Sequence, residues 1–460
     1  MTEPSLQSTI DALRLHFGDR LSTKEAVREH HGHDMSRQPT RLPDAVVYAE
    51  SDDEVARVVS ACFEAGIPVT PFAAGSSMEG HTIPLKGGIS LDLTRMNRIV
   101  QVNHEDFDAQ VQAGVTRKQL NAHIRDTGLF FPVDPGADAS LGGMASTRAS
   151  GTTAVRYGTM RENVLALRVV TPQGKIISTG RRTKKSSTGY DLTKLFVGAE
   201  GTLGVITEVT VRLHPIPETI ASAVCAFETM RGAVEAVVAT IQSGIPVARI
   251  EFLDEVAVEA ANRHAGLTLK LAPTLFLEFH GSPRWVEEQS NTVAEIAADL
   301  GGSDFQWSTR TEDRERLWKA RHETIYSNQT LRPGCKAFTT DVCVPISRLA
   351  EAVLAAREDI DNSFVMGKII GHVGDGNFHV GYLIKPEIPE ELAEAERLAE
   401  RLYQRAIDMG GTFSGEHGIG ISKLKYLRRE HGDAVDMMNA IKAALDPKGI
   451  MNPGKLGQVE

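Results

Sequence analysis

D-P-G-A-D-A-S-L-G-G-M-A-S-T-R-A-S-G-T-T-A-V-R-Y-G-T, residues 134–159, is the stretch of sequence that decides the fold. A second glycine-rich stretch, F-A-A-G-S-S-M-E-G-H, occupies residues 72–81. Glycine lets backbone N–H groups approach a phosphate closely, and small Ser and Ala side chains keep the wall of a binding site thin. The two stretches therefore predict that amide dipoles hold a pyrophosphate, so that a dinucleotide is the natural ligand.

Neither stretch has the spacing of the common nucleotide-binding motifs. G-x-G-x-x-G does not follow a strand directly, and G-x-x-x-x-G-K-[ST] is absent from both stretches. A Rossmann or P-loop site is thus disfavoured. The alternative interpretation of the two stretches is that they are tight surface turns.

The composition is that of an ordinary globular protein with two or three domains in 460 residues. A formal net charge of -10 argues against nucleic-acid binding, because phosphate neutralisation needs concentrated Lys and Arg. The four cysteines lie far apart without C-x-x-C, which disfavours an iron–sulfur cluster or a cysteine zinc site. No apolar run approaches a membrane span and the N-terminus has no signal-peptide pattern, so we expect a cytoplasmic protein without a transmembrane segment, with peripheral association with a membrane as the alternative.

The order of strand-like and helical patterns predicts an α+β fold with three parts. Short apolar runs beside the glycine-rich loops indicate a nucleotide-binding domain over residues 1–218, with its core from about residue 40. Strand-like runs then alternate with helical patterns over residues 219–427, which favours a sheet covered by helices and a second domain. The last segment, 428–460, is too short to fold alone and is expected to pack back on the first domain. The strand-like runs expected in the second domain are 221–227, 273–279, 338–344, 367–373 and 378–384.

A pair of histidines in G-H-V-G-D-G-N-F-H-V, residues 371–380, suggests a metal site. Gly374-Asp375-Gly376-Asn377 is a strong turn signal, and a hairpin there would set His372 directly across from His379. Cross-strand Cβ atoms are then about 5 Å apart, close enough to share one ion. Neutral imidazoles suit Zn²⁺, Mn²⁺ or Fe²⁺. The alternative is that the pair is purely structural.

A carboxylate and a histidine stand between glycines in S-G-E-H-G-I-G, residues 414–420. This pattern is more typical of an exposed catalytic turn than of a packed core. Adjacent side chains do not easily aim at one point, so the economical division puts Glu416 on the metal and His417 on the substrate. A histidine in such a turn can act as a general base, because an ordinary imidazole suits proton transfer near neutral pH.

Four motifs carry a resemblance to a known family: P-F-A-A-G-S-S-M-E-G-H, D-P-G-x-x-x-S-L-G-G-M, A-S-G-T-x-A-V-R-Y-G-T and L-F-V-G-A-E-G-T-L-G-V-I-T. In this order they resemble the vanillyl-alcohol oxidase-type, or PCMH-type, flavoprotein superfamily, and within it the FAD-linked D-lactate dehydrogenases. The resemblance runs from about residue 40 to 455. It implies a two-subdomain PCMH-type FAD-binding domain followed by a ferredoxin-like α+β substrate domain, or cap, with an antiparallel sheet.

The resemblance also implies which residues bind FAD, mainly through backbone atoms. The first loop would hold the pyrophosphate, the second would line the flavin cleft, and residues 200–206 would lie near the adenine end. His81 lies near the position where many members attach FAD covalently, but the D-lactate branch binds FAD non-covalently, which we expect here. Arg148 stands where relatives carry a small residue or Asn. The FAD-binding residues expected are Gly75, Ser76, Ser77, Gly80, His81, Pro135, Gly136, Leu141, Gly142, Ser146, Gly151, Tyr157, Glu200, Gly201, Ile206 and, at the flavin ring, Asn452.

In the family the metal ligands would be His372, His379 and Glu416, and His417 the general base. The resemblance implies hydride transfer from a D-2-hydroxy acid to N5 of FAD. L-W-K-A-R-H-E (317–323) and R-P-G-C-K (332–336) resemble the D-lactate branch, in which Arg321 would grip the substrate carboxylate and Lys336 would support it. The alternative for Arg321 is an ordinary helix-surface charge.

Several readings stay open at this point. D-lactate is the expected substrate, with D-2-hydroxyglutarate and glycolate as alternatives that share the same motifs. A flavin-free metal hydrolase is a further alternative, but it would leave both glycine-rich loops unexplained. A non-catalytic nucleotide-binding protein is another, but it would leave Glu416 and His417 without a function. No heme or cluster motif is present, so electrons must leave to a cytochrome, an electron-transfer flavoprotein, a quinone or oxygen.

Overall fold

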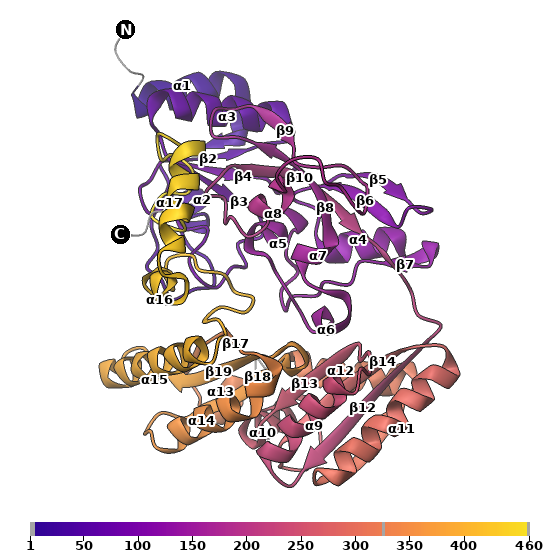
Figure 1. The fold of residues 1–460 in the computed structure, drawn as a ribbon. Helices are drawn as coiled ribbons and strands as arrows, with labels where there is room; N and C mark the ends of the chain where they lie inside the picture. The colour runs from indigo at the N-terminus through magenta and orange to yellow at the C-terminus, as the bar shows by residue number, and fades with distance from the viewer. Residues whose placement is uncertain (1–4, 324–326, 458–460) are drawn as a thin grey trace. The chain divides into compact units, whose positions relative to one another are not determined.

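The structure is a computed structural model that describes residues 5–323 and 327–457, without the side chains of 320, 322 and 323. Unit 1 comprises residues 1–150, 158–216 and 416–460, and unit 2 comprises residues 151–157 and 217–415. The chain thus leaves unit 1, forms unit 2 and returns (Figure 1). These boundaries lie near the expected ones at 218 and 427, with the second displaced toward the N-terminus.

Unit 1 begins with a four-stranded sheet in the order β1-β2-β4-β3. Strands β2, β4 and β3 are parallel, so the connections between them cross over, and α3 provides one of these crossovers. Ser51 caps α3 by accepting from the N–H of Glu54, and an acidic first turn follows it. The elements are β1 (Leu21–Ser22), β2 (Ala45–Tyr48), β3 (Val69–Phe72), β4 (Ile89–Asp92), α1 (Leu6–Phe17), α2 (Glu25–His30) and α3 (Asp52–Ala65).

The second sheet of unit 1 is antiparallel and has the order β5-β6-β10-β8-β9. Helix α5 packs on β6 and β10, and its Gly142 has no room for a side chain because a Cβ would lie 2.5 Å from that of Ala113. The strands are β5 (Ile99–Asn103), β6 (Asp108–Gln112), β8 (Val164–Val170), β9 (Ile176–Ser178) and β10 (Val205–Arg212), with the small pair β7 (Leu129–Phe130) and β11 (His214–Pro215). The helices are α4 (Arg117–Ile124), α5 (Leu141–Thr147), α7 (Met160–Asn163) and α8 (Leu192–Phe196).

The C-terminal segment contains α16 (Leu427–His431) and α17 (Ala434–Leu445) and belongs to unit 1. It is tied to the first sheet, because the N–H of Val69 donates to the carbonyl of Ile450 and the N–H of Asn452 donates to that of Val69. The buried Lys442 adds a bond from its Nζ to the carbonyl of Thr202 at 2.6 Å. The end of the chain therefore lies against the start of the fold.

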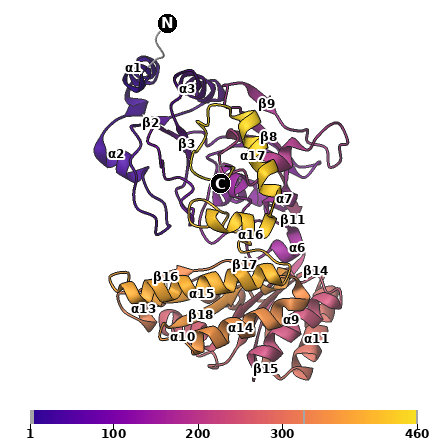
Figure 2. The same cartoon turned by 60° about the vertical axis from the view of Figure 1, so that its left-hand side comes forward.

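Unit 2 is built on one antiparallel sheet in the order β15-β12-β14-β13-β18-β19-β16, with β17 paired to β19. Helices α15, α14, α9 and α11 lie side by side in that order along one face (Figure 2). The strands are β12 (Thr219–Phe227), β13 (Arg249–Leu253), β14 (Thr274–Gly281), β15 (Gly302–Ser308), β16 (Lys336–Thr339), β17 (Val342–Cys343), β18 (Gly367–Gly371) and β19 (Asn377–Ile384). The helices are α6 (Ala154–Tyr157), α9 (Met230–Gln242), α10 (Glu255–Ala265), α11 (Pro283–Asp299), α12 (Thr311–Glu323), α13 (Asn328–Leu331), α14 (Leu349–Asp361) and α15 (Pro389–Asp408).

The other face of this sheet carries buried polar side chains. Side chains alternate along a strand, so Glu251 and Leu253 share a face, and the pairing of Glu251 with Phe276 and of Leu253 with Ile370 extends it across the sheet. Helices α10 and α12 cover part of this face through an apolar cluster of Leu253, Ala257, Val258, Phe276, Trp318 and Ile370. We call this side of the sheet the polar face.

The predicted fold class is confirmed: the protein is α+β, and the sheet of unit 2 is antiparallel. The expected strand over 338–344 is two short strands, β16 and β17, because only parts of it pair with β19. Strands β13 and β15 were not predicted from the sequence. β13 has only five residues with a charged residue at its centre, and β15 has no fully buried residue.

Candidate functional site

The hairpin of β18 and β19 brings the two predicted metal-binding histidines together. Their ring centroids lie 5.5 Å apart, and one ring nitrogen of each lies within 4.8 Å of the other. The predicted register is wrong, however, because His379 pairs with Ile370 and not with His372. The connection is a 3-10 turn at Val373–Asp375 followed by Gly376 in the left-handed region, which is longer than a four-residue loop. A shift of two residues keeps a side chain on the same face, so the histidines still meet.

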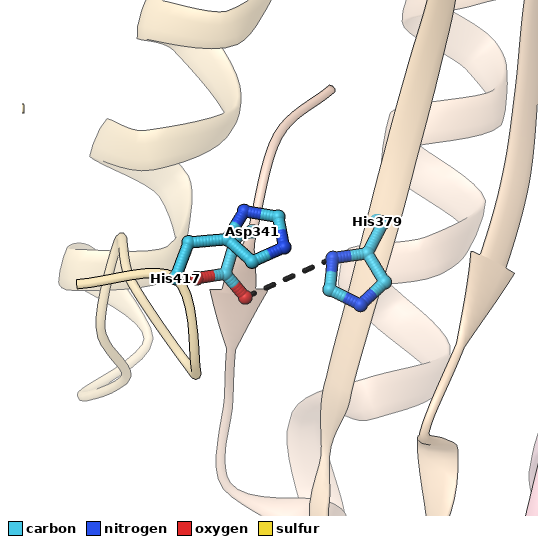
Figure 3. A group of neighbouring side chains, drawn as sticks. All are labelled: Asp341, His379 and His417. Carbon is cyan, nitrogen blue, oxygen red and sulfur yellow. Dashed lines mark ion pairs between the residues drawn. The ribbon is translucent and has the colours of Figure 1, made fainter. Parts of the chain in front are cut away.

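Each histidine uses its Nδ1 to contact an acceptor of the protein. Nδ1 of His372 lies 2.7 Å from Oε1 of Glu251, and Nδ1 of His379 lies 3.1 Å from the carbonyl of Thr340. The carboxylate of Asp341 lies 3.7 Å from the same His379 nitrogen, which is the ion pair drawn in Figure 3. A histidine held in this way at Nδ1 presents Nε2 as its metal-binding atom. This pair therefore fits a divalent cation.

Glu251 connects the histidine pair to the predicted substrate-binding arginine. It lies at the centre of β13, is fully buried and accepts from Nη2 of Arg321 at 2.5 Å. Burial pushes the pKa of Glu251 upward, but His372 and Arg321 outweigh it and hold the pKa below its usual range. Arg321, on α12, is only 4% exposed, which rules out the alternative that it is an ordinary charged residue on a helix surface. Lys336 is exposed at the start of β16, and the side chains of His322 and Glu323 lie outside the described residues.

The segment that carries the predicted third ligand follows unit 2 directly. The N–H of Gly415, the last residue of unit 2, donates to the carbonyl of Asp341 at 3.4 Å, and Glu416 is the next residue. Within unit 1, Nε2 of His417 lies 3.9 Å from Oε1 of Glu416 and its Nδ1 lies 3.5 Å from Oε1 of Glu79. The half-buried imidazole of His417 thus has a carboxylate beside each nitrogen.

Glu79 is buried and pairs with a buried lysine. Nζ of Lys423 lies 3.0 Å from its Oε1. Burial raises the pKa of Glu79, but Lys423 and His417 outweigh burial and lower it. Glu79 is therefore ionised near neutral pH and is suited to orient an imidazole that accepts a proton.

Glu200 fixes the loop that follows His417. Its carboxylate accepts from the N–H groups of Ile419 at 2.7 Å and Gly420 at 2.9 Å, and lies 3.2 Å from Nε2 of His81. Burial lowers the pKa of His81, but the charge of Glu200 outweighs burial and raises it. Glu200 was predicted to lie near the adenine of FAD, but its carboxylate contacts other residues of the protein. His81 beside it is 5% exposed.

The first glycine-rich loop fits the diphosphate of a dinucleotide. The backbone N–H groups of Gly75, Ser76 and Ser77 make no hydrogen bond to any residue in the described part of the chain, and all three residues are half-buried. The hydroxyl of Ser77 donates to Asp34 at 2.7 Å, which holds the loop. Amide donors of this kind can bind an anionic acceptor. FAD supplies one, so the residues present fit the cofactor.

The other predicted FAD-binding residues fall into two groups. In unit 1, Leu141, Gly142 and Ser146 lie on α5, and Pro135 and Gly136 lie before it. Gly80 is buried in the first loop, Gly201 is buried shortly before β10, and Ile206 is buried on β10. In unit 2, Gly151 and Tyr157 belong to the short segment 151–157. The hydroxyl of Tyr157 lies 2.7 Å from Nδ1 of His280.

Asn452 and Arg148 have clear structural roles. Nδ2 of Asn452 donates to the carbonyls of His81 at 3.0 Å and Glu200 at 2.7 Å, so it ties the C-terminal segment to the first loop. Arg148 ends α5 in the left-handed conformation, at a φ of 57°, where Asn or Gly is common. Its Nη2 donates to the carbonyl of Val197 at 3.2 Å.

Three carboxylates beside the predicted site residues were missed from the sequence: Glu79, Glu251 and Asp341. Glu79 stood inside a quoted motif, between Met78 and Gly80, and a charged residue in a loop of small residues was a usable signal. Glu251 interrupts the apolar run I-E-F-L, which could have indicated a functional carboxylate on a buried strand. No pattern in the sequence singles out Asp341.

Known families match both parts of the chain. The model of the FAD binding domain matches residues 43–180, and that of FAD linked oxidases, C-terminal domain, matches residues 216–456. "Probable D-lactate dehydrogenase, mitochondrial" of Danio rerio is 50% identical over 98% of this chain and 92% of its own. The chain belongs to the FAD-linked D-lactate dehydrogenase family. It is therefore an FAD-dependent oxidoreductase that acts on a CH–OH group.

Two further comparisons concern the family and the fold. "D-lactate dehydrogenase (cytochrome), mitochondrial" of Arabidopsis thaliana is 44% identical over 97% of this chain and 79% of its own. The crystal structure of p-cresol methylhydroxylase with substrate bound has a TM-score of 0.81 at 20% identity, covering 100% of this chain and 98% of that one. This structural likeness confirms the predicted PCMH-type fold.

The cytoplasmic location expected from the sequence is wrong. Both relatives of this FAD-linked dehydrogenase family are named as mitochondrial proteins. The inference failed because composition and the lack of a secretory pattern do not distinguish compartments, which are selected by short receptor-read signals. As for membranes, no helix in the described ranges is both long and apolar enough to cross one.

Proposed function

We propose that this enzyme oxidises a D-2-hydroxy acid, with D-lactate converted to pyruvate. The observation that carries this proposal is the 50% identity, over 98% of the chain, to a relative named as a D-lactate dehydrogenase. The reaction removes a hydride from the carbon that bears the hydroxyl and a proton from the hydroxyl oxygen. When bound, FAD supplies the acceptor for the hydride.

The residues proposed to hold FAD are those of the two glycine-rich loops, without a covalent bond. The open N–H groups of Gly75, Ser76 and Ser77 support binding of the pyrophosphate. His81 is buried against Glu200 and serves as a charged partner there, which supports non-covalent FAD. Gly151, Tyr157 and the residues around α5 are proposed to line the flavin cleft.

The residues proposed to hold a divalent cation (Zn²⁺, Mn²⁺ or Fe²⁺) are His372, His379 and Glu416. The close approach of the two imidazoles and the acceptors at both Nδ1 atoms support this ligand set. Such an ion would supply Lewis acidity that lowers the pKa of the substrate hydroxyl.

His417 is proposed to take the hydroxyl proton. Its position one residue from Glu416 would set it beside the same hydroxyl, and Glu79 orients its ring and stabilises the imidazolium that forms. The bonds from Glu200 to Ile419 and Gly420 hold this loop, so the base is pre-positioned.

Arg321 is proposed to bind the substrate carboxylate, with Lys336 in support. Nε of Arg321 is buried and has no hydrogen-bond partner among the described residues, which supports an acceptor that arrives with the substrate. A carboxylate is the natural partner of a guanidinium. Electrons then leave to a partner, for which a cytochrome, an electron-transfer flavoprotein or a quinone is proposed.

The test is turnover of D-lactate, L-lactate, D-2-hydroxyglutarate and glycolate with an artificial dye as electron acceptor, together with metal analysis of the purified protein. We expect D-lactate to give the highest kcat/KM and the protein to contain one divalent ion per chain. Preferred turnover of D-2-hydroxyglutarate or glycolate would change the assigned substrate but would leave the proposed type of reaction unchanged. Absence of turnover on every 2-hydroxy acid would overturn the proposal.

A further inference from the structure

Glu251 is a buried carboxylate that contacts two residues from different elements, His372 directly after β18 and Arg321 on α12. Its Oε1 lies 2.7 Å from Nδ1 of His372, and its Oε2 accepts from Nη2 of Arg321 at 2.5 Å. It is 0% exposed, so bulk solvent does not reach either oxygen. Both oxygens are therefore used, one on each neighbour.

Each of these contacts fixes one atom that the proposed reaction needs. A carboxylate at Nδ1 of a histidine holds that nitrogen in its N–H form and makes Nε2 the more basic, metal-binding nitrogen. A carboxylate at one Nη of an arginine restrains the planar guanidinium, because its donors lie in a rigid fork. The orphaned Nε of Arg321 lies in the same fork.

We propose that Glu251 is a positioning residue that couples the metal ligand His372 to the carboxylate-binding Arg321. This inference rests on the proposed function, because it concerns the ion and the substrate assigned there. Through one carboxylate, the imidazole that faces the metal and the guanidinium that faces the substrate are set relative to each other. Loss of this carboxylate weakens both metal binding and substrate binding, while the glycine-rich loop of unit 1 that is proposed to hold the pyrophosphate of FAD is left intact.

A matched control lies on the neighbouring strand. Glu278 on β14 is also buried, and its carboxylate contacts a histidine and an arginine: it lies 2.8 Å from Nε2 of His280 and 3.4 Å from Nη1 of Arg249. Arg249 pairs with Glu278 across the strands, so both glutamates lie on the polar face. Replacing Glu278 removes the same charge from the same sheet without touching His372 or Arg321.

The experiment compares Glu251→Gln and Glu278→Gln in the full FAD-loaded protein. Affinity for Zn²⁺ and for Mn²⁺ alone is measured by competition with a chromophoric chelator, without substrate. We expect Glu251→Gln to weaken metal binding by about 10- to 100-fold, the size seen when an outer-shell partner is lost. We also expect it to raise the KM for D-lactate and to keep the flavin spectrum, while Glu278→Gln keeps the metal affinity of the wild type.

The outcomes separate this inference from the proposed function. A wild-type protein that binds no metal, or oxidises no D-2-hydroxy acid, contradicts the proposed function itself. A wild type that does both, with Glu251→Gln binding metal equally well, overturns the coupling role alone. An equal loss of metal affinity in both variants would show a general effect of removing a charge from the sheet, and this would also overturn the coupling role of Glu251. If Glu251→Gln does not fold, Glu251→Asp tests the same point, because the shorter side chain cannot reach both partners, and wild-type metal affinity there would again be contradictory.

Discussion

Oε1 of Glu79 lies 3.5 Å from Nδ1 of His417, and the same oxygen lies 3.0 Å from Nζ of Lys423. Glu79 comes from the first glycine-rich loop and the other two residues come from the stretch 416–427, so residues far apart in the sequence build one charged group within unit 1. A buried carboxylate beside an imidazole favours the imidazolium and orients the ring. The loop predicted to bind phosphate thus also supports the proposed base.

Replacement of Glu79 by Gln is expected to lower kcat more than it raises KM. The ring of His417 loses the charge that stabilises its protonated form, and we expect about 10- to 100-fold slower reduction of the flavin by D-lactate. Rapid-mixing absorbance at the flavin band measures this rate. Glu54→Gln is the control, since Glu54 is also a partly buried glutamate with an ion pair, to Arg20, in unit 1. An unchanged rate in Glu79→Gln would contradict the role given to this pair.

Replacement of His417 by Asn should nearly abolish flavin reduction while metal content and FAD content stay at wild-type levels. The loss of a general base costs about 10²- to 10⁴-fold in rate. Reduction that becomes faster at high pH, where hydroxide or solvent replaces the base, would support the assignment. If the variant keeps the wild-type rate at neutral pH, another group takes the proton.

Substitution of Gly75 by Ala is expected to weaken FAD binding. At a φ of 64° an alanine is strained, and its Cβ would lie 2.9 Å from the ring of Phe72, so the loop has to move. Gly66 is a matched control, because its φ is 65° but a Cβ there meets nothing within 4 Å. We expect about tenfold weaker FAD binding for Gly75→Ala, measured by flavin fluorescence titration, a cost of about 1.4 kcal/mol. Gly66→Ala should lower thermal stability and leave FAD affinity unchanged, and equal FAD affinities in the two variants would contradict the loop assignment.

Acid should destabilise the protein in part through His214. Burial, with a smaller effect of Arg212, lowers the pKa of His214 from its usual 6.5 to about 4. The unfolded chain therefore binds more protons than the folded one between these values, so the free energy of unfolding falls as the pH drops from 6.5 toward 4. His214→Gln should flatten this part of the stability curve, measured by denaturant unfolding across that pH range. A variant whose curve parallels that of the wild type would show that His214 does not titrate in this way.

Much of the site was predictable because its chemistry is local in sequence. The glycine-rich loops, the histidine hairpin and the E-H pair each place their key residues within one short motif, and a slip of two residues in the predicted register did not separate His372 from His379. Side chains alternate between the two faces of a strand, so a register shift of two residues leaves each side chain on the face where it was predicted.

What was not predicted depends on contacts between distant segments. Glu251 lies on a five-residue strand whose pairing with β14 and β18 is set by the whole sheet, and Asp341 reaches His379 only after β19 is in place. Glu79 meets His417 because the chain returns to unit 1 after residue 415. Sequence patterns report periodicity along one segment, whereas these contacts are decided by the tertiary fold.

The most direct test of the account is anaerobic addition of D-lactate to the FAD-loaded protein, before and after the divalent ion is removed with a chelator, with L-lactate as the stereochemical control. We expect D-lactate to bleach the flavin band and L-lactate to leave it unchanged, and we expect bleaching to be lost on chelation and to return with added metal. Bleaching by D-lactate that persists in metal-free protein would contradict the metal's role, and absence of bleaching in the metal-loaded protein would contradict the proposed reaction.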